Sequence, residues 1–178
     1  LAGLLGEGPR VRGRVAAAAR LAERRTGITA ALLDGRVDAW PLPALRAEAV
    51  LGEDALTVLA LDAPGLTGAE GHLDAHARVA LDGSRLEGRL DAFFPALARL
   101  PGLDARGRAR LRASVDLARG AAGGYRGYRG EAHARATLRG VAYAGLGAER
   151  LDLDADARGA LDAPRVDLRV GAARVRAP

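Results

Sequence analysis

The sequence predicts an all-β fold, an elongated antiparallel sheet with one apolar and one charged face. Two observations carry this prediction. Apolar and polar residues alternate with a period of two in many segments, and this period places one residue class on each face of a β-strand. Short turn motifs, such as Asp82-Gly83, separate most of these segments. This pattern is typical of strands joined in a meander.

The alternation is clearest in residues 107–117. The odd positions hold Gly, Ala, Leu, Ala, Val and Leu, and the even positions hold three Arg, a Ser and an Asp. Ala and Arg favour helices, but helical side chains two residues apart point about 200° apart. Leu111, Val115 and Leu117 would then be scattered around a helix, whereas a strand collects them on one face. The period therefore predicts a strand.

Other segments show the same alternation. Four are nearly as regular, namely residues 73–81, 130–138, 151–157 and 166–170. Six are less regular, namely residues 11–21, 28–33, 36–40, 45–51, 55–61 and 86–92. The turn motifs are Asp34-Gly35, Pro64-Gly65, Asp82-Gly83, Pro101-Gly102, Gly123-Gly124 and Gly145 to Gly147. Only residues 16–25 and residues 93–100 suggest short helices.

Composition limits the functional classes. The chain has no Cys, which excludes disulfides and thiolate metal sites. No apolar run approaches the roughly 20 residues that span a bilayer. The sequence begins without Met and ends inside an alternating pattern. We therefore expect residues 1–178 to be a single segment within a longer protein.

The expected apolar face consists mostly of small aliphatic side chains. Such a face must be hidden against a second layer or by curling of the sheet. Left in water, it costs about 25 cal/mol per Å², so either lipid or a tightly closed core has to cover it. The expected lining residues are Val11, Val15, Leu73, Val79, Leu81, Leu86, Leu90, Leu111, Val115, Leu117, Leu138, Leu151, Leu153, Val166, Leu168 and Val170.

Two segments resemble a known family. Residues 159–170 read Gly-Ala-Leu-Asp-Ala-Pro-Arg-Val-Asp-Leu-Arg-Val. This run is similar to the Gly-x-Leu-x-x-Pro-x-hydrophobic-x-hydrophobic motif of TamB, the translocation and assembly module subunit, and of its AsmA-like relatives. Residues 97–117, a Leu-rich connector followed by Pro-Gly-Leu and an alternating strand, resemble the unit that precedes this motif. The same combination of alternating segments and short turns extends over nearly the whole chain.

The resemblance implies a β-taco, a long curled antiparallel sheet with an apolar inner groove. It implies a periplasmic location, with an inner-membrane anchor outside this sequence. Family members are implicated in phospholipid transport between the two membranes, and in outer-membrane protein assembly and secretion with an Omp85-type partner. We therefore expect phospholipid acyl chains as ligands, an Omp85-type partner for the full-length protein, no cofactor and no enzymatic activity.

Two other functions fit the same patterns. A structural β-repeat, such as a spacer of a cell-envelope or surface protein, would have a solid core. Alternatively, the net charge of +5 and the run Gly124-Tyr125-Arg126-Gly127-Tyr128-Arg129-Gly130 would suit single-stranded nucleic acid. A solvated charged face and a flexible loop are the plainer interpretations of these features, so nucleic acid is not an expected partner.

Two groups of residues resemble metal sites. Asp152, Asp154 and Asp156 match the start of a calcium loop, but Ala157 replaces the expected Gly and no Glu closes the loop. On a strand they form an outward row that Arg on a neighbouring strand would balance. His72 and His76 have the spacing of a helical zinc pair, but on a strand they would lie about 13 Å apart. We expect no metal site.

A serine nucleophile would have to be Ser84 or Ser114, the only serines. Neither lies in a Gly-x-Ser-x-Gly elbow, and the sequence marks no His partner for either. The sequence therefore predicts no catalytic site.

Overall fold

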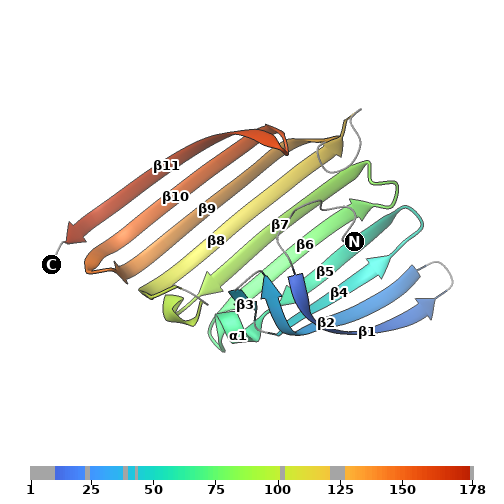
Figure 1. The fold of residues 1–178 in the computed structure, drawn as a ribbon, viewed down its shortest axis with the longest axis horizontal. Coiled ribbons are helices and arrows are strands. Elements are labelled where there is room, and N and C mark those ends of the chain that lie inside the picture. The colour runs from blue at the N-terminus through green and yellow to red at the C-terminus, as the bar shows by residue number, and fades with distance from the viewer. Residues whose placement is uncertain are drawn as a thin grey trace.

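The computed structural model describes residues 11–22, 25–37, 40–42, 44–100, 103–120 and 127–176. These residues form one antiparallel sheet of eleven strands (Figure 1). The strands are β1 (Val11–Ala22), β2 (Arg25–Val37), β3 (Trp40–Leu42), β4 (Leu45–Leu51), β5 (Ala55–Asp62), β6 (His72–Ala80), β7 (Arg85–Phe94), β8 (Ala105–Arg119), β9 (Tyr128–Tyr143), β10 (Leu146–Ala160) and β11 (Ala163–Arg176). Two short helical segments are α1 (Pro64–Thr67) and the 3-10 helix η1 (Leu97–Arg99).

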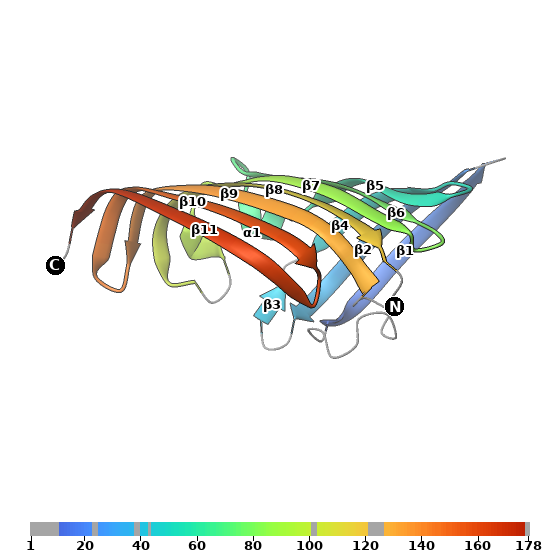
Figure 2. The ribbon, with the colours of Figure 1, turned by 90° about the horizontal axis from the view of Figure 1, so that it is seen from above.

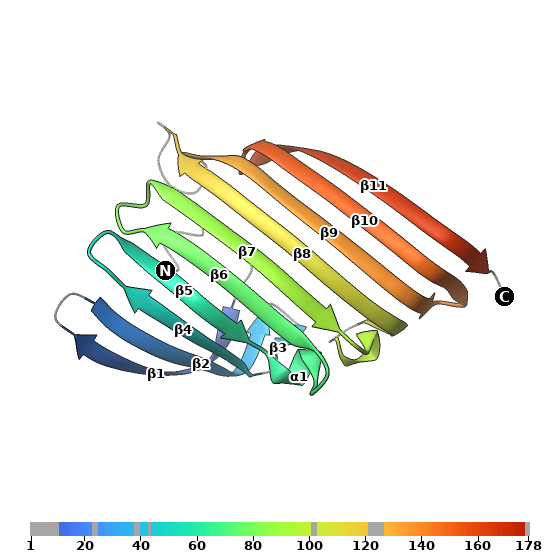
Figure 3. The ribbon, with the colours of Figure 1, turned by 180° about the vertical axis from the view of Figure 1, so that it is seen from behind.

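Except for β3 and β4, strands that follow each other in the chain are neighbours in the sheet. The order is β1-β2-β4-β5-β6-β7-β8-β9-β10-β11, and β3 pairs with β2. Figure 3 shows the same order from behind. The sheet is not closed, since β1 and β11 lie at opposite edges. The all-β antiparallel meander expected from the sequence is therefore confirmed.

Two predicted boundaries near the N-terminus are wrong. Asp34-Gly35 is not a turn but lies within β2, where the β1–β2 register shifts between Arg12 and Arg14. Gly13 lies at this shift, and a Cβ on it would lie 2.9 Å from Gly35 Cα, so the turn-like glycines serve a bulge. Residues 36–40 are not one strand, because residues 36–37 belong to β2 and Trp40 opens β3.

Of the two predicted short helices, only the one at residues 93–100 is found, and only in part. Residues 16–22 belong to β1 and Arg25 opens β2, so the described residues of this segment form strands and not the predicted helix. Pairing between β1 and β2 satisfies the backbone and overrides the helix propensity of Ala and Arg. Residues 93–94 end β7, and only residues 97–99 form a helical turn.

The turn motifs also have mixed outcomes. Asp82-Gly83 lies in the turn between β6 and β7. The turn predicted at Gly145 to Gly147 lies at residues 144–145 instead, because residues 146–147 belong to β10. Pro64-Gly65 instead opens α1. Pro101-Gly102 and Gly123-Gly124 lie outside the described residues. Residues 128–130 begin β9, and Tyr128 donates a hydrogen bond of 2.6 Å to the Gly83 carbonyl, so this part of the Tyr-Arg run is not a flexible loop.

The register aligns apolar residues with apolar residues across the sheet. One row across one face, from β6 to β11, consists of Leu73, Ala92, Leu111, Ala136, Leu153 and Val170. The row next to it on the opposite face consists of Asp74, Asp91, Arg112, Arg135, Asp154 and Arg169. Because side chains alternate along each strand, one face of the sheet is apolar and the other is charged.

The packed core lies at one end of the apolar face. Its buried residues are Ala92, Phe94, Leu97, Ala105 and Ala109, and Leu66 of α1 packs against them. The segment α1 follows β5, and η1 follows β7. Because β5 and β7 run in the same direction in the antiparallel sheet, both segments cover the apolar face at the same end. Figure 2 shows that the sheet is arched and that both connections lie on its hollow side.

In the part of the chain that the structure describes, neither helical segment is long and apolar enough to cross a bilayer.

Candidate functional site

The apolar face is a candidate surface for binding a hydrophobic ligand. Register places most of the predicted lining residues on it, from Val15 on β1 to Val170 on β11. Leu81 is an exception, since it lies beyond the end of β6 in a turn. Val11 pairs with Val37 across the bulge, and its side chain lies outside the described part. The sequence patterns thus identify the face correctly but not its ends.

The sequence-based list omitted residues of β2, β4 and β5 on the same face. They include Ile28, Leu32, Ala49, Leu56 and Val58, which pair in register with one another or with predicted lining residues. Their alternation is visible in the sequence, but the bulge between β4 and β5 interrupts it after Val58. Only strand pairing shows that they continue the same surface.

Coverage of this face is uneven. Ala92 on β7, at the packed end, is 0% exposed, whereas Val15 on β1 is 70% exposed and Leu168 on β11 is 63% exposed. Between these limits, Leu111, Val115 and Leu117 on β8 are half-buried. Apart from the region under α1 and η1, no second layer among the described residues shields the face.

The middle of the apolar face is hollowed. A depression of about 490 Å³ crosses strands β6 to β10. Its lining includes Ala75, Ala77, Gly88, Ala113, Ala132 and Ala134. These residues carry at most one side-chain carbon, whereas Leu73 and Leu111 lie in the row beside them. The hollow therefore follows from the residue sizes, and it runs across the strands rather than along one of them.

The opposite face is held together by ion pairs between strands. Asp91 on β7 accepts hydrogen bonds from Arg110 (3.1 Å) and Arg112 (2.9 Å) of β8 and contacts His72 of β6 at 3.2 Å. The hydrogen bond from Arg110, together with those from His72 and Arg112, lowers the pKa of Asp91 from 3.8 to about 2. Such bonds stabilise the ionised carboxylate.

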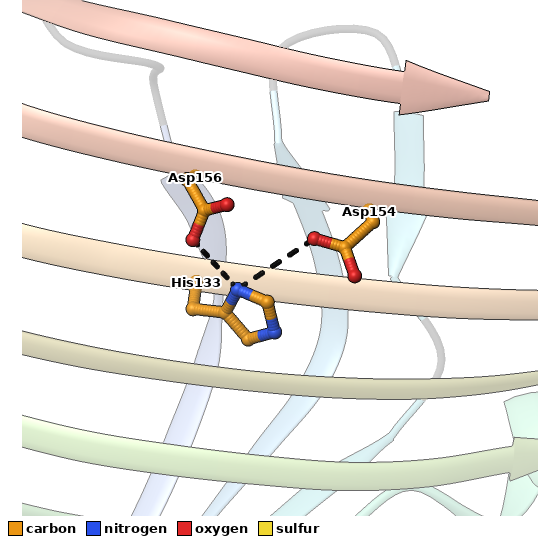
Figure 4. Close-up of side chains that lie close together, drawn as sticks. All are labelled: His133, Asp154 and Asp156. Atoms are coloured by element: carbon orange, nitrogen blue, oxygen red, sulfur yellow. Dashed lines mark hydrogen bonds and ion pairs between the residues drawn. The ribbon is translucent and has the colours of Figure 1, made fainter.

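His133 on β9 lies beside Asp154 and Asp156 of β10 (Figure 4). Its Nδ1 lies 2.9 Å from Asp156 Oδ1 and 3.9 Å from Asp154 Oδ1. One potential ligand atom of each residue lies within 4.8 Å of the others, which is close enough for a shared divalent cation. However, Arg135 contacts Asp154 at 2.6 Å, and the hydrogen bond to His133 lowers the pKa of Asp156. Each carboxylate thus already has a partner within the protein, Arg135 for Asp154 and His133 for Asp156.

The sequence predicts that Arg on a neighbouring strand balances the charge of the aspartate row. This is confirmed at Asp154, which pairs with Arg135 on β9. Asp152 instead accepts hydrogen bonds from Thr137 of β9 and from Arg150 of its own strand. His72 and His76 contact different carboxylates, Asp91 and Asp74 respectively.

Sequence reasoning did not connect Ser114 with a histidine, yet the two lie together. Ser114 lies opposite His133, and His133 lies opposite Asp156. Within the described residues, no hydrogen bond joins the Ser114 hydroxyl to the imidazole, which an activated serine requires. Backbone N–H groups of β8 and β9 pair in the sheet ladder, so they are not free to stabilise an oxyanion. Ser84 donates its backbone N–H to Asp82 in a turn.

No protein-family model, curated protein or solved structure matches this chain. The apolar face and the charged face therefore have to be interpreted from their own chemistry.

Proposed function

We propose that this chain is a non-enzymatic segment of a TamB-like protein that spans the periplasm. Its apolar face would form the inner groove of a β-taco and shield phospholipid acyl chains on their way from the inner to the outer membrane. The full-length protein would also support outer-membrane protein assembly with an Omp85-type partner. The TamB resemblance of residues 97–117 and 159–170 supports this assignment.

One observation carries the proposal: the apolar face continues in register from β1 to β11 but is covered only near α1 and η1. The chain exposes 12438 Å², whereas a compact monomer of 18.4 kDa would expose about 8,200 Å². Burying a Val or Leu side chain stabilises a protein by about 1.5 to 3 kcal/mol. A hydrophobic ligand along the face would recover this free energy.

The chemistry of the hollow favours acyl chains over a polar metabolite. Small-molecule sites usually contain a few placed polar groups that fix the ligand's orientation. Here Ala75, Gly88, Ala113 and Ala134 offer no polar side-chain group. The hollow is also lined by His76, Arg89, Ser114 and His133, but these residues alternate with the apolar ones along their strands and direct their side chains to the other face. A lining of this kind distinguishes ligands only by apolarity and width, which suits hydrocarbon chains of varied length.

The proposal is tested by extracting the purified chain with organic solvent and analysing the extract by mass spectrometry. We expect phospholipid to co-purify with the wild-type chain. Val115→Asp places a charge in the hollow and should abolish lipid occupancy while the β-sheet circular dichroism persists. Ser114→Asp, the matched control on the adjacent residue and the charged face, should retain the lipid. Absence of bound lipid in the wild-type chain would contradict the proposal.

The alternative function is a structural β-repeat spacer with a solid core. The packing of Leu97 against the buried residues of the sheet favours it, since at that end the face is closed by the chain itself. The same variants distinguish the two functions. In a spacer, Val115→Asp would bury an unpaired charge and unfold the chain, because such burial costs several kcal/mol.

A further inference from the structure

Four arginines line a second cavity, at the end of the sheet near η1. The cavity has a volume of about 850 Å³, and its lining includes Arg106, Arg108, Arg139 and Arg150, together with residues 95–98. Arg108 on β8 lies directly opposite Arg139 on β9, and Arg139 lies directly opposite Arg150 on β10. Three neighbouring strands thus bring like charges together in one row.

The protein provides little compensating charge inside this cavity. Glu149 is the one acidic residue among those lining it, and Arg174 on β11 already contacts its carboxylate at 2.7 Å. Arg150 is paired with Asp152 at 2.7 Å. Arg139 lies close enough to Asp152 to help lower its pKa, after the stronger effects of the hydrogen bonds from Arg150 and Thr137. The oxygens of Asp152 are therefore already shared.

Within the described residues, no hydrogen bond or ion pair holds the guanidinium groups of Arg106, Arg108 or Arg139. Like charges directly opposite each other on neighbouring strands destabilise a sheet. The pair Arg108 and Arg139 is thus unfavourable in the protein alone, and a bound anion would remove the repulsion.

A second pair of opposed arginines shows that this arrangement is not a simple result of the arginine content. Arg112 and Arg135 lie opposite each other on the same two strands. There, Asp91 accepts a hydrogen bond of 2.9 Å from Arg112, and Asp154 contacts Arg135 at 2.6 Å. The sheet supplies a carboxylate for each arginine at that position but not at Arg108 and Arg139.

The backbone at this site is irregular in a way that requires glycine. The register of β8 and β9 shifts between Arg106 and Arg108, and Gly107 between them has a φ of 116°. A Cβ on Gly107 would lie 2.8 Å from the carbonyl oxygens of Arg139 and Gly140. Bulges often redirect side chains next to functional sites. Here the bulge separates two arginines that line the same cavity.

We infer that Arg106, Arg108 and Arg139 form a binding site for a phosphate-type oxyanion. Guanidinium groups bind phosphate through paired, charge-assisted hydrogen bonds. Side chains opposite each other on adjacent strands begin about 5 Å apart, so two or three guanidinium groups can reach one tetrahedral anion. The anion is either a free phosphate or the phosphate of a lipid headgroup. The headgroup alternative rests on the proposed function, whereas the site itself does not.

Isothermal titration calorimetry of the purified chain in phosphate-free buffer tests the site, with inorganic phosphate as the first probe. We expect the double variant Arg108→Gln/Arg139→Gln to weaken binding about tenfold or more. The matched control, Arg112→Gln/Arg135→Gln, removes the same charge from the same strands and should change the affinity by no more than about twofold. Equal weakening in both variants, or no binding by the wild-type chain, would overturn the inference.

Circular dichroism establishes that each variant is folded. If the Gln variant is not, Arg108→Lys/Arg139→Lys replaces it, because it keeps both charges but loses the planar fork and should still bind phosphate more weakly than wild type. Unchanged affinity in the Lys variant would count against a guanidinium site.

The source of the phosphate is resolved by titrating monomeric dihexanoyl phosphatidylglycerol. Affinity equal to that of inorganic phosphate assigns the site to the free anion. Tighter binding than inorganic phosphate, which Arg108→Gln/Arg139→Gln weakens, assigns it to a lipid headgroup. If no lipid binds the apolar face while the Arg108 and Arg139 variant still loses phosphate, the proposed function fails and the anion site stands.

Discussion

Gly88 on β7 lies directly opposite Val115 on β8, and a Cβ on Gly88 would lie 3.2 Å from Val115 Cγ1. The missing side chain keeps the hollow of the apolar face open at this point. Gly88→Leu should fill part of the hollow, and we expect less co-purifying lipid per chain in mass spectrometry. The free energy of unfolding should fall by about 1 to 3 kcal/mol, because Val115 has to shift to admit the added Cβ.

Gly171→Leu is the control for this variant, since a side chain at Gly171 would meet no atom within 4 Å and Gly171 lies opposite Asp152 on the charged face. It should leave the lipid content unchanged. An equal loss of lipid in both variants would show that the hollow does not determine occupancy.

Acid should weaken the chain through Asp91. Its pKa is about 2 in the folded chain and 3.8 in the absence of its partners, so between these values the unfolded chain binds more protons. The stabilisation by Asp91 is therefore complete above about pH 5 and is lost as the pH falls through this window. Asp91→Asn should lower the melting temperature at pH 7, and its difference from wild type should shrink towards pH 2.

Thermal melts followed by circular dichroism across this pH range check the prediction. Asp62→Asn serves as the control, because Asp62 has no ion pair or hydrogen bond from its side chain in the described part of the chain. If the melting temperatures of wild type and Asp91→Asn differed by the same amount at every pH, this result would contradict the role of the Arg110 and Arg112 contacts.

The position of the packed core predicts unequal effects of two leucine truncations. Leu97→Ala removes a side chain that is 2% exposed and should destabilise the chain by about 2 to 5 kcal/mol in urea unfolding. Leu168→Ala removes one that is 63% exposed, and the change should be about 0.5 kcal/mol. Comparable losses at both positions would mean that the apolar face is covered as far as β11.

The edge strand β11 should promote self-association. Val166, Leu168 and Val170 are about 60% exposed, and an apolar edge strand offers unpaired backbone groups to another chain. Leu168→Lys should lower the average mass at high concentration in analytical ultracentrifugation. Arg169→Lys, which keeps its charge on the opposite face, should not. A wild-type chain that is monomeric at all concentrations would contradict this prediction.

Much of the fold was predictable because the alternation and the turn motifs agree. Residues 45–51 form β4 with the expected bounds, and residues 107–117 lie within β8. The errors occur where local signals are ambiguous. Asp34-Gly35 has the composition of a turn, but it serves a bulge because Gly13 approaches Gly35 on the neighbouring strand. A contact between residues far apart in the sequence cannot be predicted from either segment alone.

The sequence by itself determined which residues share a face, because side-chain direction on a strand depends only on the position along that strand. It therefore identified Leu111 and Val115 as apolar-face residues. Only the tertiary structure decided which residues of different strands meet, because strand register depends on pairing. Register opposes Arg108 to Arg139, places His133 beside Asp156, and leaves the apolar face covered at Leu97 but open at Leu168.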